Sequence, residues 1–247
     1  MATQKGIITL VGTIDGINFY IRKGKAVARK AGGGFNGKAI KNKPSMVRVR
    51  ENNSEFGHCS RVKKEFRIAL FPFLTHYKES TLHGRMMQLF QGIKDCDTSS
   101  VRGSRKVGLG IVTAAGSALF KEFQFTPKCD VSVVVPMNGI YDAVACVYNV
   151  VDFAISLVRF PAGATHMELQ FGVLGVDFDL GIYKLFMGNA IVFERNVEVS
   201  NFTLYPSVIP ETGLLRYAFL GVTFYQEING VKYVLKEDGN VGIMYVG

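Results

Sequence analysis

Residues 214–235 read LLRYAFLGVTFYQEINGVKYVL, and the fold class is clearest in this stretch. Two runs rich in aromatic and β-branched residues flank the dipeptide Asn229-Gly230, which favours the left-handed backbone angles of a tight hairpin. The pattern predicts two antiparallel strands, residues 214–228 and 231–235. A helix of three or more turns through this stretch would contradict that interpretation.

Similar short runs fill the C-terminal half of the chain. We expect further strands at residues 131–135, 143–151, 154–160, 166–171, 182–186, 191–199 and 241–246. Turns are indicated at Asn138-Gly139, Pro161-Ala162-Gly163, Gly188-Asn189 and Asp238-Gly239. Many short strands with tight turns are typical of a sandwich or jelly-roll-like barrel. Residues 109–247 are therefore predicted to form an antiparallel β-sandwich or jelly-roll-like domain.

A different pattern marks the start of the N-terminal region, residues 1–108. Residues 6–14 and 17–22 alternate apolar and polar side chains on either side of Asp15-Gly16, and residues 25–30 continue as a more basic strand. This predicts a small β-meander. Because so small a sheet leaves a face and its edges open, we expect it to pair with another subunit or with the β domain.

Beyond the meander, the sequence predicts an arm and two helices. Residues 31–53 are rich in glycine and cations, as in a mobile arm, and residues 46–50 alternate so that Arg48 and Arg50 would share one face of an extended segment. Apolar residues then recur at three and four positions over residues 56–70 and 80–94, which predicts a helical hairpin. The whole chain is therefore expected to be α+β and mainly β.

Charge is distributed unevenly along the 247 residues. Residues 1–108 carry 21 Lys and Arg against 7 Asp and Glu, a net charge of +14, whereas the remainder carries 8 against 13, a net charge of −5. This asymmetry indicates that the first region contacts something anionic. The composition, 48% hydrophobic, supports a sizeable core, and we expect no signal peptide and no membrane span.

Sequence motifs for catalysis or metal binding are weak. The stretch GGGFNGKA at residues 32–39 has the glycine spacing of a phosphate-binding loop, but Ala39 replaces the hydroxyl residue that holds magnesium, so we interpret it as a linker. Asp177 and Asp179 lack a third ligand, and the histidines and four cysteines lack zinc spacing. We therefore predict no catalytic residue, no metal and no cofactor, and we expect a non-enzymatic protein.

The basic residues of the first region are the strongest functional signal. Two arms and one helix carry cations that could neutralise phosphate groups without reading sequence. A solvated helix face is an equally weighted alternative. The candidate nucleic-acid-binding residues are Arg48, Arg50, Arg61, Lys63, Lys64, Arg67, Arg102, Arg105 and Lys106.

Several stretches carry a resemblance to known sequences. The segment GIITLVGTIDGINFY at residues 6–20, with RVREN at 48–52, EF at 55–56 and FYQEINGV at 224–231, is similar to an uncharacterised Bacteroidetes protein family. That resemblance implies no activity and no site residue. The layout of a basic arm, a helix and a β-rich remainder also resembles phage and prophage structural proteins.

The sequence leaves two functions open. One is a self-assembling structural protein, coat-like or packaging, that forms a homo-oligomer and contacts nucleic acid or an acidic neighbour through its basic region. The other is a β-sandwich binding module for a carbohydrate or protein ligand. For the first we expect a cytoplasmic location or packaging in a virion-like assembly.

Overall fold

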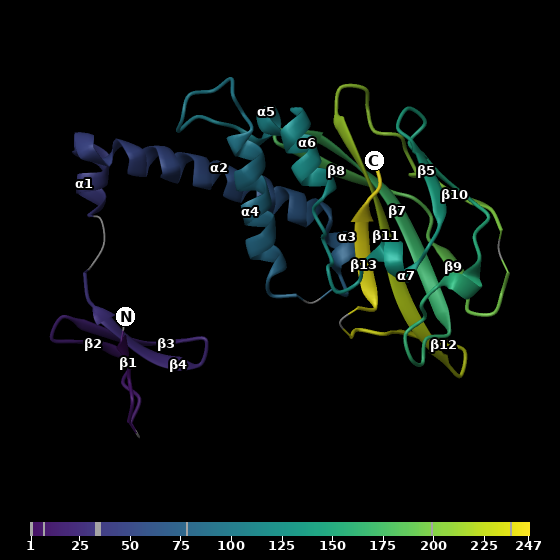
Figure 1. The fold of residues 1–247 in the computed structure, drawn as a ribbon, viewed down its shortest axis with the longest axis horizontal. Coiled ribbons are helices and arrows are strands. Elements are labelled where there is room, and N and C mark those ends of the chain that lie inside the picture. Colours follow the sequence, from purple (N-terminus) through teal and green to yellow (C-terminus); the bar gives the residue numbers. More distant parts are fainter. Residues whose placement is uncertain (1, 7, 33–35, 78, 199, 238) are drawn as a thin grey trace. The chain divides into compact units, whose positions relative to one another are not determined.

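The chain forms two compact units, Met1–Arg50 (unit 1) and Glu51–Gly247 (unit 2). The computed structural model describes residues 2–6, 8–32, 36–77, 79–198, 200–237 and 239–247 (Figure 1). The boundary expected after residue 108 falls inside unit 2. Phe66 and Phe90 from before that boundary share one hydrophobic core with Tyr217 and Phe219 from after it.

Unit 1 contains the predicted meander. Its strands are β1 (Ala2–Thr3), β2 (Gly12–Ile14), β3 (Ile17–Arg22) and β4 (Lys25–Lys30), all paired antiparallel in the order β1-β4-β3-β2. Asp15 and Gly16 both have positive φ, as the tight turn requires. The sequence prediction was right for this sheet, although β2 is shorter than the run expected over residues 6–14.

The expected mobile arm is wrong over most of its length. Residues 36–53 form α1 (Gly37–Asn42), the 3-10 turn η1 (Pro44–Met46) and the start of α2 (Val47–Ala69). Asn36 caps α1 by accepting a hydrogen bond from the Lys38 backbone, and Pro44 begins η1, where its missing N–H costs nothing. Residues 46–50 are therefore helical, and residues 33–35 of the glycine-rich stretch lie outside the described residues.

Unit 2 is built on one large antiparallel sheet. Its two central strands are β7 (His166–Asp177) and β11 (Leu215–Ile228), paired along most of their length. Two shorter strands pair with each on its outer side. These are β8 (Ile182–Met187) and β9 (Ile191–Glu194) on β7, and β12 (Val231–Val234) and β13 (Val241–Tyr245) on β11. The predicted hairpin at Asn229-Gly230 is confirmed, since β11 and β12 pair around it and both residues have positive φ.

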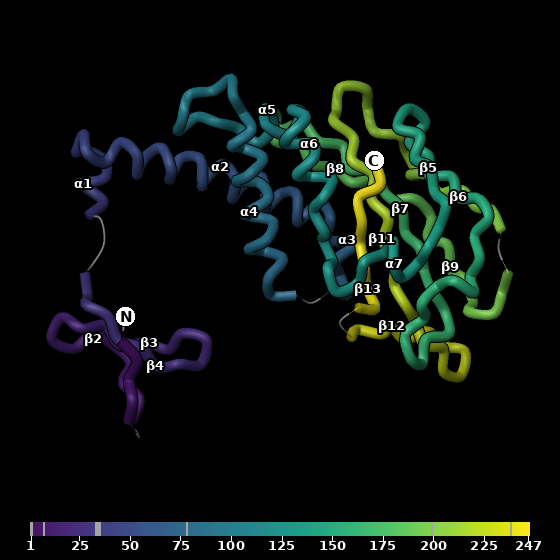
Figure 2. Tube along the Cα trace, in the orientation of Figure 1, coloured from purple at the N-terminus to yellow at the C-terminus, as the bar shows by residue number. Residues whose placement is uncertain are grey.

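The hairpin predicted at Asp238-Gly239 includes Asp238, which lies outside the described residues. β12 and β13 both pair with β11, so they follow one another along the same strand (Figure 2). A smaller sheet of β5 (Asn138–Asp142), β6 (Val147–Val151) and β10 (Phe202–Leu204) completes the strands of the unit. The turn expected at Asn138-Gly139 is wrong, because both residues belong to β5.

The remaining helices are α3 (Phe71–Leu74), α4 (Leu82–Asp95), α5 (Val107–Ile111), α6 (Ala114–Lys121), α7 (Val131–Val134) and the 3-10 turn η2 (Ile155–Leu157). Two of the expected strands are therefore wrong, at residues 131–135 and 154–160. At residues 131–135, the Asp130 carboxylate accepts a hydrogen bond from the Ser132 backbone and starts a helical turn, although the run is rich in β-branched residues. The helices predicted at 56–70 and 80–94 are confirmed as α2 and α4.

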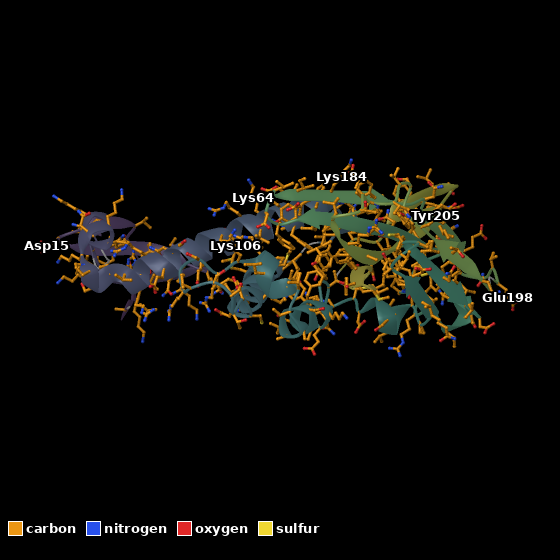
Figure 3. All side chains as sticks on the ribbon, turned by 90° about the horizontal axis from the view of Figure 1, so that it is seen from above. Asp15, Lys64, Lys106, Lys184, Glu198 and Tyr205 are labelled. Carbon is orange, nitrogen blue, oxygen red and sulfur yellow. The ribbon has the colours of Figure 1, made fainter. Side chains whose placement is uncertain are left out.

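Helices and the smaller sheet cover opposite faces of the large sheet. Leu174 and Phe219 belong to the core that includes α2, α4 and α6, whereas their neighbours Val173 and Leu220 belong to the core shared with β5, β6 and β10. Alternate residues of a strand face opposite sides, so both faces of the sheet are buried. Side chains fill these layers, while Lys184 and Tyr205 lie at the outer surface (Figure 3). The fold is α+β and mainly β, with two antiparallel sheets packed face to face.

Two glycines let the helical layer approach the sheet closely. Phe73 of α3 lies over Gly172 of β7 and Gly221 of β11. A Cβ atom at Gly221 would lie 2.6 Å from Cδ1 of Phe73, and one at Gly172 would lie 3.2 Å from Cζ of the same ring. The aromatic ring therefore occupies space that any other residue at position 221 would fill.

Candidate anion-binding groove

A groove beside α2 contains the densest group of the predicted cations. It has a volume of about 670 Å³ and is lined by Ser60, Arg61, Lys63, Lys64, Arg67, Ile68, Phe71 and His83. The rotation of α2 is fixed by the buried side chains of Cys59, Val62 and Phe66. Residues 60, 61, 64, 67 and 68 recur at three and four positions, so they form a stripe beside the buried one. Four of the nine predicted site residues therefore meet in one place.

Lys63 lies at the buried side of this groove. Only 5% of the residue is exposed, and its Nζ lies 3.1 Å from each ring nitrogen of His83. Burial lowers the pKa of Lys63, and the neighbouring Arg67 guanidinium lowers it further. A buried ammonium is costly unless an anion compensates it. An anion entering the groove would supply that compensation.

No acidic residue is among the described side chains that line the groove. Lys64 of the groove pairs with Glu65 at 3.9 Å, and both of these side chains are well exposed. Such a pair contributes little stability and is easily exchanged for another anion. Arg61, Lys64 and Arg67 are exposed, as are Ile68 and Phe71. The groove thus combines accessible cations with a lining surface that is mainly apolar.

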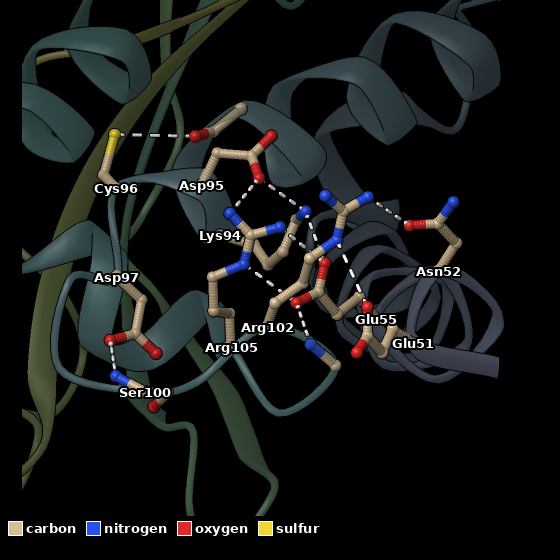
Figure 4. Close-up of polar contacts among 12 residues, drawn as sticks. Glu51, Asn52, Glu55, Lys94, Asp95, Cys96, Asp97, Ser100, Arg102 and Arg105 are labelled. Carbon is tan, nitrogen blue, oxygen red and sulfur yellow. Dashed lines mark hydrogen bonds and ion pairs between the residues drawn. The ribbon is translucent and has the colours of Figure 1, made fainter. Parts of the chain in front are cut away.

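Arg105, in contrast, is engaged in an internal ion-pair network (Figure 4). Its guanidinium donates to both carboxylate oxygens of Glu55 at 2.8 Å and pairs with Asp95 at 2.7 Å. Lys94 donates to Glu55 at 2.8 Å, and the backbone N–H of Gly103 donates at 2.7 Å. Glu55 is only 3% exposed, and the hydrogen bonds from Arg105 are the largest cause of its lowered pKa.

Arg102 and Lys106 of the second basic connector make longer and more exposed contacts. Arg102 donates to Asn52 at 3.0 Å and pairs with Glu51 at 3.5 Å, while Lys106 pairs with Asp179 at 3.7 Å. Buried Asp97 accepts hydrogen bonds from the backbone N–H groups of Ser99, Ser100 and Lys106. Although burial raises the pKa of Asp97, these hydrogen bonds outweigh it and lower the pKa. The connector is therefore an ordered loop, held by backbone hydrogen bonds to Asp97 and by the Arg105 network.

Arg48 and Arg50 belong to unit 1 and lie apart from one another on the first turn of α2. Residues two positions apart on a helix point in directions that differ by about 200°. Arg48 and Arg50 therefore do not share the face that was expected for an extended segment. Arg50 donates to the backbone carbonyls of Ile40 and Lys43, at 2.6 and 3.1 Å. Its guanidinium thus satisfies carbonyl groups at the end of α1.

Other chemistry-bearing residues have local structural partners. Asp177 accepts hydrogen bonds from the backbones of Asp179 and Leu180, which organises the turn after β7. His166 contacts Thr165 and lies 3.4 Å from Glu227. Among the described residues, no group of three His, Cys, Asp or Glu side chains is placed to hold a metal ion. None of the described helices is both long and apolar enough to cross a bilayer.

Sequence reasoning missed two parts of the groove. His83 comes from α4, and nothing in its local sequence indicates contact with Lys63. Phe71 lies just beyond the helix predicted over residues 56–70, and it is exposed beside the cations. The three- and four-residue spacing of Arg61, Lys64, Arg67 and Ile68 on that helix was the available sequence signal for the groove.

Comparison with protein-family models, curated proteins and solved structures finds no match. The resemblances to a Bacteroidetes family and to phage structural proteins therefore stay predictions.

Proposed function

We propose that the chain is a non-enzymatic, self-assembling structural protein, coat-like or packaging, whose α2 groove binds the phosphate groups of nucleic acid without reading sequence. The observation that carries this proposal is the meeting of Arg61, Lys63, Lys64 and Arg67 in one groove whose described lining contains no carboxylate. A cytoplasmic or virion-like setting is consistent with such a role.

The geometry of the cations suits a charged polymer. Arg61 and Arg67 are six residues apart, which corresponds to about 9 Å along the helix axis. A nucleic-acid strand carries one phosphate per about 3.4 Å of axis, so this distance spans more than two phosphates. Lys63 gains an anionic partner at the same time. An acidic segment of a neighbouring subunit is the competing occupant, and the experiment below distinguishes it.

The test compares two triple variants with equal changes in net charge. One replaces Arg61, Lys64 and Arg67 with Ala, and the matched control replaces Lys121, Lys232 and Lys236, which are exposed cations outside the groove. Binding of fluorescent duplex DNA is measured by anisotropy over a range of salt concentrations. Each lost phosphate contact lowers the slope of log affinity against log salt by about 0.9, so the groove variant should lose about 2.7 units.

The control variant should keep most of the slope of the wild type. If both variants lose affinity equally, net charge rather than the groove is responsible, and the proposed site is wrong. If the wild type binds no nucleic acid even at low salt but binds poly-glutamate through the same residues, the groove serves an acidic protein partner. Nucleic-acid packaging would then be excluded.

A further inference from the structure

The strand pairing of unit 1 places its large apolar side chains on one face. Residues directly opposite each other in an antiparallel pair point to the same side of the sheet. Ile17 pairs with Ile14 and Lys30, Phe19 with Gly12 and Ala28, and Ile21 with Ala26. We define the apolar face by the side chains of Ile14, Ile17, Phe19, Ile21, Ala26 and Ala28.

The opposite side of the same sheet is largely basic and polar. It carries Arg22, Lys25 and Arg29, together with Asn18, Tyr20 and the buried Val27. Arg29 lies over the ring of Tyr20, 5.5 Å from its centroid. The single cation on the apolar face, Lys30, lies at the end of β4. The two faces therefore fit different partners, and the apolar face does not fit an anion.

The apolar face is open to solvent. Ile14, Ile17 and Ile21 keep 54%, 43% and 58% of their surface exposed, although each belongs to a strand. Isoleucine in a strand normally gains its stability from burial, at about 25 cal/mol for each Å² of apolar surface. A contiguous set of exposed isoleucines on a regular sheet marks an association surface.

We infer that this apolar face pairs with the same face of a second copy of the chain. The face carries a ridge and a trough: large side chains line β3, with Ile14 of β2 beside them, and Ala26 and Ala28 lie on the neighbouring β4. A two-fold axis through the face places the ridge of each copy over the alanines of the other. Because its only charged group lies at the end of β4, a second copy can cover the face without burying an unpaired charge.

Edge-to-edge pairing is the less suitable route to a dimer. The strands at the two edges, β1 and β2, have only two and three residues, so each edge is interrupted where the longer β4 and β3 extend past them. Face-to-face pairing covers more apolar surface than edge-to-edge pairing does. The four strands hold 17 residues at about 3.3 Å each and lie about 4.8 Å apart, so the sheet offers roughly 270 Å² of footprint per copy. This is below the roughly 800 Å² per partner of a standard interface, so we expect a reversible dimer.

The inference rests on the self-assembly part of the proposed function, and it leaves the basic faces of both copies pointing outward. The experiment measures molar mass by light scattering over a concentration series, with nuclease-treated protein and a reducing agent. Wild type should approach twice the 27.2 kDa chain mass. Replacing Ile14 and Ile21 with Gln should raise the dimer dissociation constant at least about a hundredfold. The matched control combines Ile8→Gln with Val11→Gln. These two aliphatic residues lie outside the strands and are more exposed than Ile14 and Ile21, so the control should leave the molar mass unchanged.

A third variant, Ala28→Leu, separates specific packing from general stickiness. It adds apolar surface but fills the trough, so ridge-in-trough pairing predicts a weaker dimer. Stronger association of this variant would overturn the inference, as would a wild type that stays monomeric at all concentrations. Loss of the dimer in the Ile8 and Val11 control alone would also overturn it. Because nucleic acid is removed, these outcomes are independent of whether the α2 groove binds DNA.

Discussion

The buried carboxylate of Glu55 offers the sharpest test of the energetics of unit 2. Glu55→Gln keeps the size of the side chain but removes its charge, which leaves Arg105 and Lys94 to share the single carboxylate of Asp95. Removing one partner from a buried ion pair costs about 3–5 kcal/mol. The matched change Glu51→Gln affects the longer contact to the half-exposed Arg102, and should cost at most about 1 kcal/mol.

Urea unfolding followed by far-ultraviolet circular dichroism measures both variants. The chain has no tryptophan, so tryptophan fluorescence cannot be used. With a urea dependence of about 2 kcal/mol per M, the loss in Glu55→Gln corresponds to a fall of about 1.5–2.5 M in the midpoint. Equal midpoints for the two variants would show that the network contributes no more than a surface ion pair, and would refute the reasoning.

Three further outcomes are expected. Unit 2 should lose stability as the pH falls below about 4.5, the ordinary value for Glu55, because a lowered folded-state pKa adds stability that is present above that pH and is lost as the carboxylate protonates. Glu79 adds to this loss: burial raises its pKa, but hydrogen bonds from Thr81 and Tyr77 outweigh burial and lower it to about 2. In urea titrations at pH 7 and pH 3, the gap between wild type and Glu55→Gln should therefore narrow, and a constant gap would contradict this assignment. Phe73→Ala should lower the free energy of unfolding by about 3–5 kcal/mol, because it leaves a cavity. Gly221→Ala should lower it by about 1–3 kcal/mol, because the added methyl group crowds the Phe73 ring. Thermal melts that show no change for either variant would exclude the close packing of Phe73 on the sheet. Lys63→Met should leave the free energy of unfolding unchanged or raised while weakening DNA binding, because it removes a buried charge, and a loss of stability above about 1 kcal/mol would show that Lys63 serves the fold instead.

Local sequence was sufficient for elements whose signals act over a few residues. The hairpin at Asn229-Gly230 and the meander turn at Asp15-Gly16 depend on two residues with positive φ, and both were predicted. The extended structure predicted for residues 46–50 and 131–135 was wrong. A short alternating or β-branched run does not exclude a helix once Pro44 or Asp130 begins one.

The candidate site was predictable only in part, because local spacing shows which residues share a helix but not which residues the fold brings to it. Arg61, Lys64 and Arg67 belong to one helix, so their spacing places them together. Arg105 looked equally available in sequence, but its partner Glu55 lies 50 residues earlier, and only the tertiary structure brings the two together. Charge in a sequence shows what a segment carries, whereas the folded chain determines which charges remain unpaired.

The close fit of Phe73 against Gly172 and Gly221 has a consequence for how relatives of this chain could be recognised. A side chain gained at Gly221 must be accompanied by a smaller residue at position 73. One gained at Gly172 must also be accommodated by Met187, whose Sδ would lie 2.9 Å from its Cβ, so these positions should vary together during evolution. Overall identity can fall far while this dependence persists, since it follows from the distance between two layers. A search that pairs a large residue just after the long helix with small residues in both central strands would therefore detect homologues too distant for ordinary alignment.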